Sequence, residues 1–243
     1  MELSIVIPCF NEESRIKKSF EQIVLYIKNN NYDTELVFIN DGSRDQTLSI
    51  LNSLVKNISN NKLIKAKIIT YKMNKGKGFA IKQGLMHSTK ELILICDADL
   101  STPIEELERL KKYIKNYDLV IGSRKQGDSV VILPQPPMRE FLGKSFSYMS
   151  KVILAVNIND FTCGFKLFKR KSAKIIADKM TINRWGYDSE ILKIATVLGL
   201  KIKEIGIFWK NDKGTKVKLS YDIFFSFIDL MRIYINNKFN RYG

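Results

Sequence analysis

The chain has 243 residues, 45% of them hydrophobic and 27% charged, which fits one folded α/β domain with an appended segment and excludes a disordered chain. Its three cysteines are widely spaced, which argues against a disulfide framework or a zinc cluster and favours a reducing, cytoplasmic setting. The formal net charge of +15 indicates either an anionic partner or a biased composition; charge alone does not choose among nucleic acid, a phosphorylated small molecule and an acidic membrane.

Strands and helices are expected to alternate through the first half of the chain. The N-terminus enters an apolar strand at once, so we expect no secretory signal. The alternation predicts a mostly parallel central sheet with helices on both faces. In such sheets ligands bind beyond the carboxyl ends of the strands, which makes the loops at 8–13, 40–45 and 96–103 the candidate site. The strand-like runs are 3–8, 35–40, 66–71, 92–96 and 118–122, and the helical patterns lie near 12–29, 44–57, 77–88 and 104–115.

A second region begins after residue 125. Residues 126–140 are rich in Pro and Gly and are predicted to be a loop, so we divide one continuous domain into halves 1–125 and 126–243. Two amphipathic helices with basic and aromatic residues are predicted at 139–156 and 221–239, either packed on the core or lying in a membrane interface. No apolar run reaches the roughly 20 residues of a membrane-spanning helix, so none is expected.

Two acidic residues, Asp97 and Asp99, follow the apolar strand at 92–96. Residues i and i+2 of an extended segment point to the same side, so the two carboxylates can converge on one ion. Carboxylate oxygens suit Mg²⁺ or Mn²⁺, ions that keep positions open for substrate phosphates. This spacing alone is a weak signal, and it gains weight from the motifs around it.

Taken together, the motifs resemble those of family 2 glycosyltransferases, which have the GT-A fold. The resemblance covers essentially the whole chain and is strongest to the polyprenyl-phosphate branch, especially the dolichyl-phosphate β-glucosyltransferases. The matching segments are SIVIPCFNEE at 4–13, FINDGS at 38–43, CDAD at 96–99, GSR at 122–124, NDFTCGFKLF at 159–168 and RWGYDSE at 184–190.

The resemblance implies an inverting enzyme that moves a hexose, with glucose from UDP-glucose favoured, from a nucleoside diphosphate to a polyprenyl or dolichyl phosphate. It would act as a peripheral protein at the cytoplasmic face of a membrane. On this interpretation the half at 1–125 binds the nucleotide sugar and the half at 126–243 binds the acceptor. Whether a separate membrane protein recruits the chain stays open.

The resemblance also assigns roles to residues on the donor side. Mg²⁺ or Mn²⁺ would be bound by Asp99, assisted by Asp97, with Ser101 close by. The nucleotide would be bound by Pro8, Phe10, Glu12, Asp41 and Lys77.

On the acceptor side, a polyprenyl phosphate is already an anion near neutral pH, so it needs no strong base. Asp160, counted with Asp97 and Asp99 among the catalytic residues, would therefore organise the metal or the sugar. The cations expected to bind the acceptor phosphate are Arg124, Lys166 and Lys216.

Three alternatives remain at this level. One is a GDP-mannose-dependent dolichyl-phosphate mannosyltransferase. Another is a family 2 enzyme acting on a saccharide hydroxyl, with Asp160 as the base. The third is a basic module that binds anionic lipid or nucleic acid without catalysis. Paired acidic motifs would repel phosphates unless a cation is present, so we expect no nucleic-acid partner.

Overall fold

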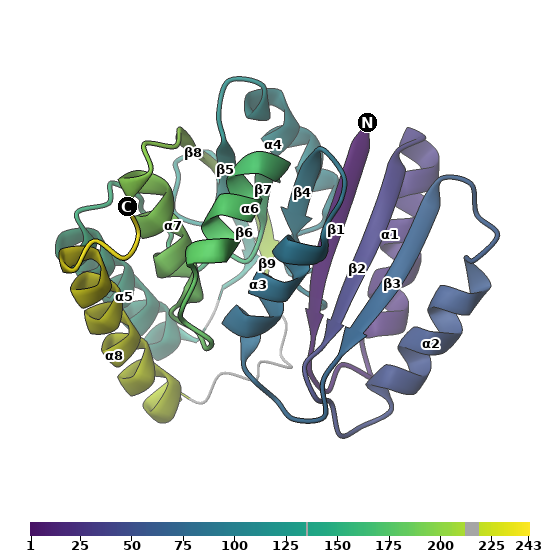
Figure 1. Cartoon of the computed structure of the whole chain (residues 1–243), viewed down its shortest axis with the longest axis horizontal. Helices are drawn as coiled ribbons and strands as arrows, with labels where there is room; N and C mark the ends of the chain where they lie inside the picture. The colour runs from purple at the N-terminus through teal and green to yellow at the C-terminus, as the bar shows by residue number, and fades with distance from the viewer. Residues whose placement is uncertain (135, 212–218) are drawn as a thin grey trace.

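A mixed sheet forms the centre of the protein (Figure 1). The computed structural model describes residues 1–134, 136–211 and 219–243. In this part of the chain seven strands pair, in the order β3 (Ile64–Thr70), β2 (Asp33–Asn40), β1 (Glu2–Cys9), β4 (Leu92–Ile95), β7 (Lys166–Lys169), β5 (Leu119–Ser123) and β8 (Ile202–Gly206). All neighbouring strands are parallel except β7, which is antiparallel to both β4 and β5.

Helices cover both faces of this sheet, and each face has its own apolar core. Strand β1 supplies both cores: Leu3, Ile5 and Ile7 pack on one side and Val6 on the other, as the two-residue period of a strand requires. The first face carries α1 (Ile16–Asn30), α2 (Thr47–Asn57), the short 3-10 helix η1 (Ile104–Glu106) and α4 (Leu107–Ile114). The second face carries α3 (Lys77–His87), α6 (Arg170–Lys179) and α7 (Tyr187–Val197), with α5 (Pro137–Leu154) and α8 (Leu219–Lys238) beyond them (Figure 1).

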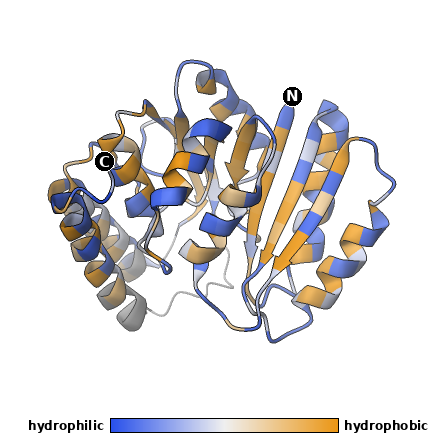
Figure 2. Ribbon diagram, viewed as in Figure 1, coloured by the Kyte–Doolittle hydropathy of each residue, from blue (hydrophilic) through white to orange (hydrophobic). Residues whose placement is uncertain are grey.

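The predicted fold class and the predicted strands and helices of the first half are confirmed. Strands and helices lie where periodicity indicated, and the largest shift is at α1, which begins at Ile16 instead of residue 12. Apolar residues dominate the central strands because parallel strands covered on both faces are buried throughout (Figure 2). The parallel order brings the loops after β1, β2 and β4 to one edge of the sheet.

The prediction of a loop over the whole of 126–140 is wrong in two places. Strand β6 (Val130–Leu133) pairs in parallel with β9 (Phe208–Lys210), and α5 begins at Pro137. The β-branched run from Val130 to Ile132 suits a strand, and proline is well tolerated at the first position of a helix. Strand β7 comes from the predicted second half and lies between β4 and β5 of the first, so the sheet draws on both halves.

Helices α5 and α8 are confirmed and lie side by side (Figure 1). Both bury part of their surface, but α5 exposes Met138, Phe141, Tyr148 and Val152 by 62–70%. Their relation to a membrane stays a prediction. In the described part of the chain, the apolar stretches of the helices are too short for a membrane crossing.

Candidate active site

The loops that follow β1 and β2 are tied together. The backbone N–H of Glu12 donates to Oγ1 of Thr47 at 2.7 Å, and the backbone N–H of Asn11 donates to Oγ of Ser43 at 3.0 Å. Pro8 is the penultimate residue of β1, and Phe10 follows the strand directly; both are partly exposed. The predicted nucleotide-binding residues of the first loop therefore lie at the carboxyl edge of the sheet, beside the loop that carries Asp41.

Asp41 is buried and binds the loop that leads into α3. Its carboxylate accepts hydrogen bonds of 2.8 Å from Nδ2 of Asn74 and from the backbone N–H groups of Lys75 and Gly76. Burial raises the pKa of Asp41, and the hydrogen bonds from the backbone N–H groups of Lys75 and Gly76 oppose the rise. Gly76 has φ +104°, a conformation that side chains rarely adopt, so glycine is required where this loop turns into the helix. Asp41 thus positions the segment that carries Lys77.

The two acidic residues after β4 each face a cation. Nζ of Lys77 lies 2.7 Å from Oδ1 of Asp97, and Nη1 of Arg15 lies 3.9 Å from Oδ2 of Asp99. Asp99 also accepts a 2.9 Å hydrogen bond from the backbone N–H of Ser101. Burial raises the pKa of Asp99, and the charge of Asp97 raises it further. The negative charge of Asp99 is therefore less well neutralised by a nearby cation than that of Asp97.

The incompletely neutralised charge of Asp99 would favour the binding of a divalent cation. Among the described residues no group of three or more His, Cys, Asp or Glu side chains is placed to hold a metal. Mg²⁺ is commonly bound by one or two carboxylates together with substrate phosphates, so a two-carboxylate site is sufficient when the substrate supplies oxygens. Asp97 and Asp99, with Ser101 beside them, are the residues that could hold such an ion.

Lys77 is the first residue of α3 and lies among aromatic rings. Its Nζ is 5.5 Å from the ring centre of Trp185 and 5.9 Å from that of Tyr187. Burial alone would lower the pKa of Lys77, but the carboxylate of Asp97 raises it well above the ordinary value. The ammonium is therefore charged, at a helix N-terminus where backbone N–H groups also favour anions.

The motif at 159–168 lies against the acidic pair. A Cβ atom on Gly164 would come within 2.2 Å of Oδ2 of Asp97, so the Asp97 carboxylate lies directly against the backbone there. Only glycine leaves room for this contact. Gly164 and Lys77, which are far apart in the sequence, thus both contact the carboxylate of Asp97.

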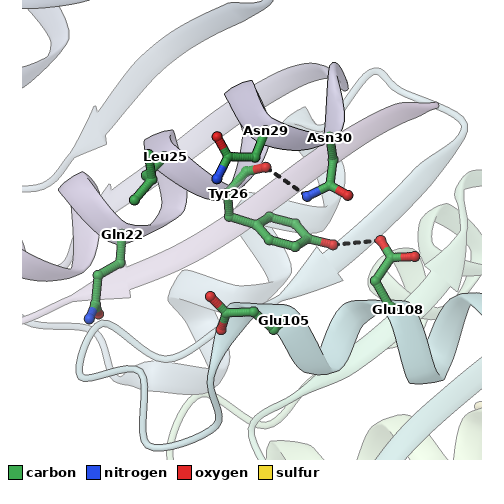
Figure 3. Close-up of a pocket in the computed structure, with 7 residues that line it drawn as sticks. All are labelled: Gln22, Leu25, Tyr26, Asn29, Asn30, Glu105 and Glu108. Carbon is green, nitrogen blue, oxygen red and sulfur yellow. Dashed lines mark hydrogen bonds between the residues drawn. The ribbon is translucent and has the colours of Figure 1, made fainter.

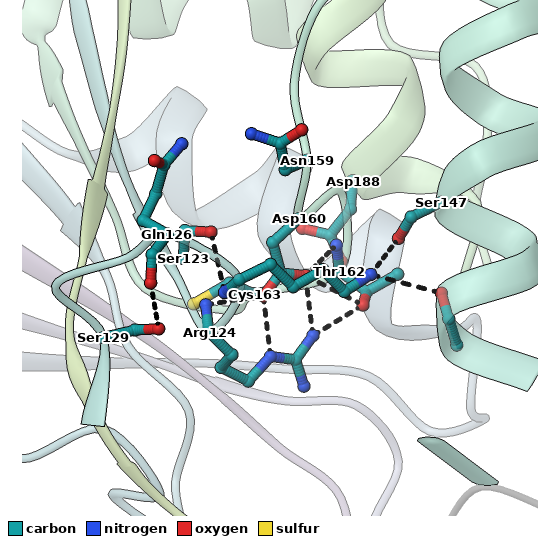
Figure 4. A network of polar contacts seen from close by, with 12 residues as sticks. Ser123, Arg124, Gln126, Ser129, Ser147, Asn159, Asp160, Thr162, Cys163 and Asp188 are labelled. Atoms are coloured by element: carbon teal, nitrogen blue, oxygen red, sulfur yellow. Dashed lines mark hydrogen bonds and ion pairs between the residues drawn. The ribbon is translucent and has the colours of Figure 1, made fainter. Parts of the chain in front are cut away.

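Asp160 forms a buried bidentate pair with Arg124 (Figure 4). Nε and Nη2 of Arg124 each donate to one carboxylate oxygen at 2.7 Å, and the backbone N–H of Arg124 donates at 2.9 Å. Burial alone would raise the pKa of Asp160, but Arg124 holds it well below its usual range. The guanidinium also lies 5.3 Å from the ring centre of Trp209. Asp160, predicted to be catalytic, and Arg124, predicted to bind the acceptor phosphate, are therefore partners in one ion pair.

The other two predicted acceptor cations differ from Arg124. Lys166 is fully buried, and its Nζ lies 2.5 Å from Oδ1 of Asp188 and 2.5 Å from the carbonyl oxygen of Cys163. Its ammonium faces Asp188 instead of solvent, which favours a positioning role over direct contact with the acceptor. Lys216 lies outside the described residues.

Three polar residues at the site were missed by the sequence reasoning. Arg15 binds Glu12, with Nη2 2.6 Å from Oε2, and links that residue to Asp99. Asn74 binds Asp41. Nζ of Lys125 donates to Oγ of Ser147 at 2.7 Å, and this contact joins the end of β5 to α5. Arg15 follows Glu12 at the i, i+3 spacing of helical neighbours, which was a usable signal. The other two contacts carry no such local pattern.

A separate pocket of about 410 Å³ lies between α1 and the segment η1–α4 (Figure 3). Its lining includes Tyr26, whose hydroxyl donates to Oε1 of Glu108 at 2.7 Å. The lining residues from α1 extend from Gln22 to the last residue of the helix, Asn30, in the direction of the amino ends of the strands. None of the predicted site residues lines this pocket.

Comparisons with known proteins identify the family. The sequence profile of the family described as glycosyl transferase family 2 matches residues 4–176. The chain is 36% identical to the dolichyl-phosphate beta-glucosyltransferase ALG5A of Trichomonas vaginalis, over 99% of this chain and 74% of that protein. It is 29% identical to the human dolichyl-phosphate beta-glucosyltransferase, over 89% of this chain and 69% of that protein.

Solved structures show the same fold. Glucosyl-3-phosphoglycerate synthase of Mycobacterium tuberculosis, in complex with Mn²⁺, UDP-glucose and phosphoglyceric acid, matches with a TM-score of 0.69 over 96% of this chain and 79% of that one. The sequence identity is 15%, so this likeness concerns the fold. With the matched profile and the motif order, it follows that the chain belongs to glycosyl transferase family 2 and is a glycosyltransferase.

Proposed function

We propose that this enzyme transfers glucose from UDP-glucose to dolichyl phosphate or a related polyprenyl phosphate, with inversion at the anomeric carbon, at the cytoplasmic face of a membrane. The observation that carries the proposal is the 36% identity to a dolichyl-phosphate beta-glucosyltransferase along 99% of the chain. Both relatives described above are named as glucosyltransferases, which favours UDP-glucose over the GDP-mannose alternative. Because the chain belongs to a glycosyltransferase family, a non-catalytic binding module is no longer a competing explanation.

On the donor side, Glu12 and Asp41 supply acceptor oxygens for the N–H and O–H groups of the nucleoside, and Phe10 supplies a ring face. Asp97 and Asp99, with Ser101, would hold Mg²⁺ or Mn²⁺. When bound, such an ion neutralises the charge that develops on the departing nucleoside diphosphate. The N-terminus of α3 and the ammonium of Lys77 add positive charge to the same edge of the sheet.

On the acceptor side, the state of Asp160 favours a phosphate nucleophile. A carboxylate whose pKa is held far below its usual range is a weak base, so it is poorly suited to remove a proton from a sugar hydroxyl. A lipid phosphate is already ionised and can attack directly. We assign Asp160 to holding Arg124 in place, and Arg124 together with Lys216 to binding the acceptor phosphate.

Donor choice can be measured by calorimetry. UDP-glucose should bind roughly tenfold or more tightly than GDP-mannose in the presence of Mn²⁺, because contacts to the base differ between the two donors. Chelation of the metal should weaken the binding of UDP-glucose. Tighter binding of GDP-mannose would replace the proposed donor, whereas equal binding with and without chelator would contradict the metal assignment.

Membrane contact is proposed through the apolar stripe of α5, formed by Met138, Phe141, Tyr148 and Val152. These residues recur at spacings of three, seven and four, so they lie along one face of the helix, and each is at least 62% exposed. A helix with such a face beside basic residues is suited to lie in a membrane interface.

A vesicle-flotation experiment tests this stripe. The wild-type protein should float with anionic vesicles, and the double variant Phe141→Glu/Tyr148→Glu should bind them more than about tenfold less well because two apolar side chains no longer insert. The control Leu25→Glu/Met86→Glu makes the same charge change at exposed apolar residues of α1 and α3. Equal flotation of all three proteins would show that the stripe of α5 does not contact the membrane.

A further inference from the structure

Charges of alternating sign run from the interior to the acidic pair. Lys166 binds Asp188 deep in the protein, and Lys77 binds Asp97 nearer the edge of the sheet. The charge of Lys77 also interacts with that of Asp188. Asp188 is buried and Lys166 fully so, which fixes the inner end of the series. Only the outer pair lies where a substrate could approach.

Within this outer pair, the carboxylate is fixed and the ammonium can move. Asp97 has a short side chain, and its Oδ2 packs against the backbone of Gly164. The contact is so close that a Cβ atom added to Gly164 would lie 2.2 Å from this Oδ2. Lys77 carries its charge on a flexible four-carbon stem. The nearby rings of Trp185 and Tyr187 offer its ammonium favourable faces over a range of positions. Of the two groups, Lys77 is therefore the one that an incoming ligand could displace.

We propose that Lys77 is an exchangeable counter-ion: it neutralises Asp97 while the donor is absent and transfers to the donor diphosphate when the donor binds, which frees Asp97 for the divalent cation. This rests on the proposed function, which supplies the diphosphate. The reason is electrostatic, because two cations on one carboxylate repel each other, whereas a diphosphate placed between them attracts both. The metal should then bind weakly to the free enzyme and more tightly once the diphosphate has drawn Lys77 away.

The variant Lys77→Met separates this role from a structural one by two readouts of opposite sign. Without nucleotide, calorimetric titration with Mn²⁺ should show binding about tenfold or more tighter than in the wild type, because the competing ammonium is gone. Without metal, UDP should bind about tenfold or more weakly, because the ammonium no longer meets the diphosphate. A variant that merely disturbs the site would bind both ligands less well.

Two further variants serve as controls. Lys75→Met removes the same charge from an exposed side chain two residues earlier, in the loop that leads into α3. The Lys75 ammonium lies over the rings of Tyr71 and Phe79, so this variant should leave Mn²⁺ binding unchanged. Lys77→Arg keeps the charge and should stay close to the wild type in both titrations. It also tests the inference if Lys77→Met does not fold, since a marked gain in Mn²⁺ affinity in Lys77→Arg would contradict the exchange.

Several results overturn the inference. One such result is that Lys77→Met binds Mn²⁺ no more tightly than the wild type and Lys75→Met do. Another is wild-type Mn²⁺ affinity that does not rise in the presence of UDP. If the wild type binds no UDP at all, the proposed function fails, but the comparison of Mn²⁺ binding without nucleotide still tests the competition between Lys77 and the cation.

Discussion

Asp99→Asn is expected to lower the rate of glucose transfer by roughly 100- to 1,000-fold or more while the protein stays folded. The substitution keeps the shape and the hydrogen bond from Ser101 but removes the charge that would hold the divalent cation at the diphosphate. The pKa of Asp99 is raised by burial and by Asp97, so ionisation of this group opposes folding at neutral pH. The variant should therefore unfold at the same temperature as the wild type or a higher one.

Steady-state kinetics and thermal unfolding of the same samples check both parts of this prediction. Asp33→Asn is the matched control, because Asp33 is a partly exposed carboxylate at the opposite, amino-terminal end of β2. It should retain wild-type turnover. A folded Asp99→Asn protein with wild-type turnover would remove Asp99 from the metal site.

Arg124→Met is expected to lower the free energy of unfolding by about 3–5 kcal/mol, because it leaves the carboxylate of Asp160 buried without its guanidinium partner. Urea unfolding at neutral pH measures this loss. The double variant Arg124→Met/Asp160→Asn removes both charges and should recover much of it, since replacing both members of a buried pair is often close to neutral. If Arg124→Met is as stable as the wild type, the buried charge of Asp160 does not need the guanidinium of Arg124 to be tolerated in the fold.

The same pair has a defined pH dependence. The pKa of Asp160 is lower in the folded protein than in the unfolded chain, so the pair stabilises the fold above the unfolded value of about 4. That contribution is lost as the pH falls from there toward the folded pKa. In Arg124→Met the loss of stability should therefore be largest at neutral pH and smaller in acid.

The parts of the fold that depend on local pattern could be predicted from the sequence. Apolar runs and helical periodicity placed the strands and helices from β1 to β5, and the spacing of Asp97 and Asp99 after a buried strand pointed to the acidic pair. Strand β7 was not predicted, because its insertion between β4 and β5 depends on tertiary pairing and its four residues carry no distinctive alternation.

The site was predictable as a set of motifs but not as a set of contacts. Sequence reasoning placed Arg124 and Lys166 together as cations for the acceptor phosphate. In the structure the two cations have different partners: Lys166 lies in the interior against Asp188, whereas Arg124 binds Asp160 and lies beside Trp209 at the end of β5. The partner of each cation is more than twenty positions away in the sequence, so no local spacing could reveal it.

Transfer of labelled glucose from UDP-glucose to dolichyl phosphate in vesicles is the most direct measurement, with unphosphorylated dolichol and chelator in parallel. The label should enter a lipid product with dolichyl phosphate and Mg²⁺ or Mn²⁺, and this product should be absent with dolichol or with chelator. Release of free glucose without a lipid product, or transfer to a saccharide hydroxyl instead, would contradict the proposal that the acceptor is a lipid phosphate.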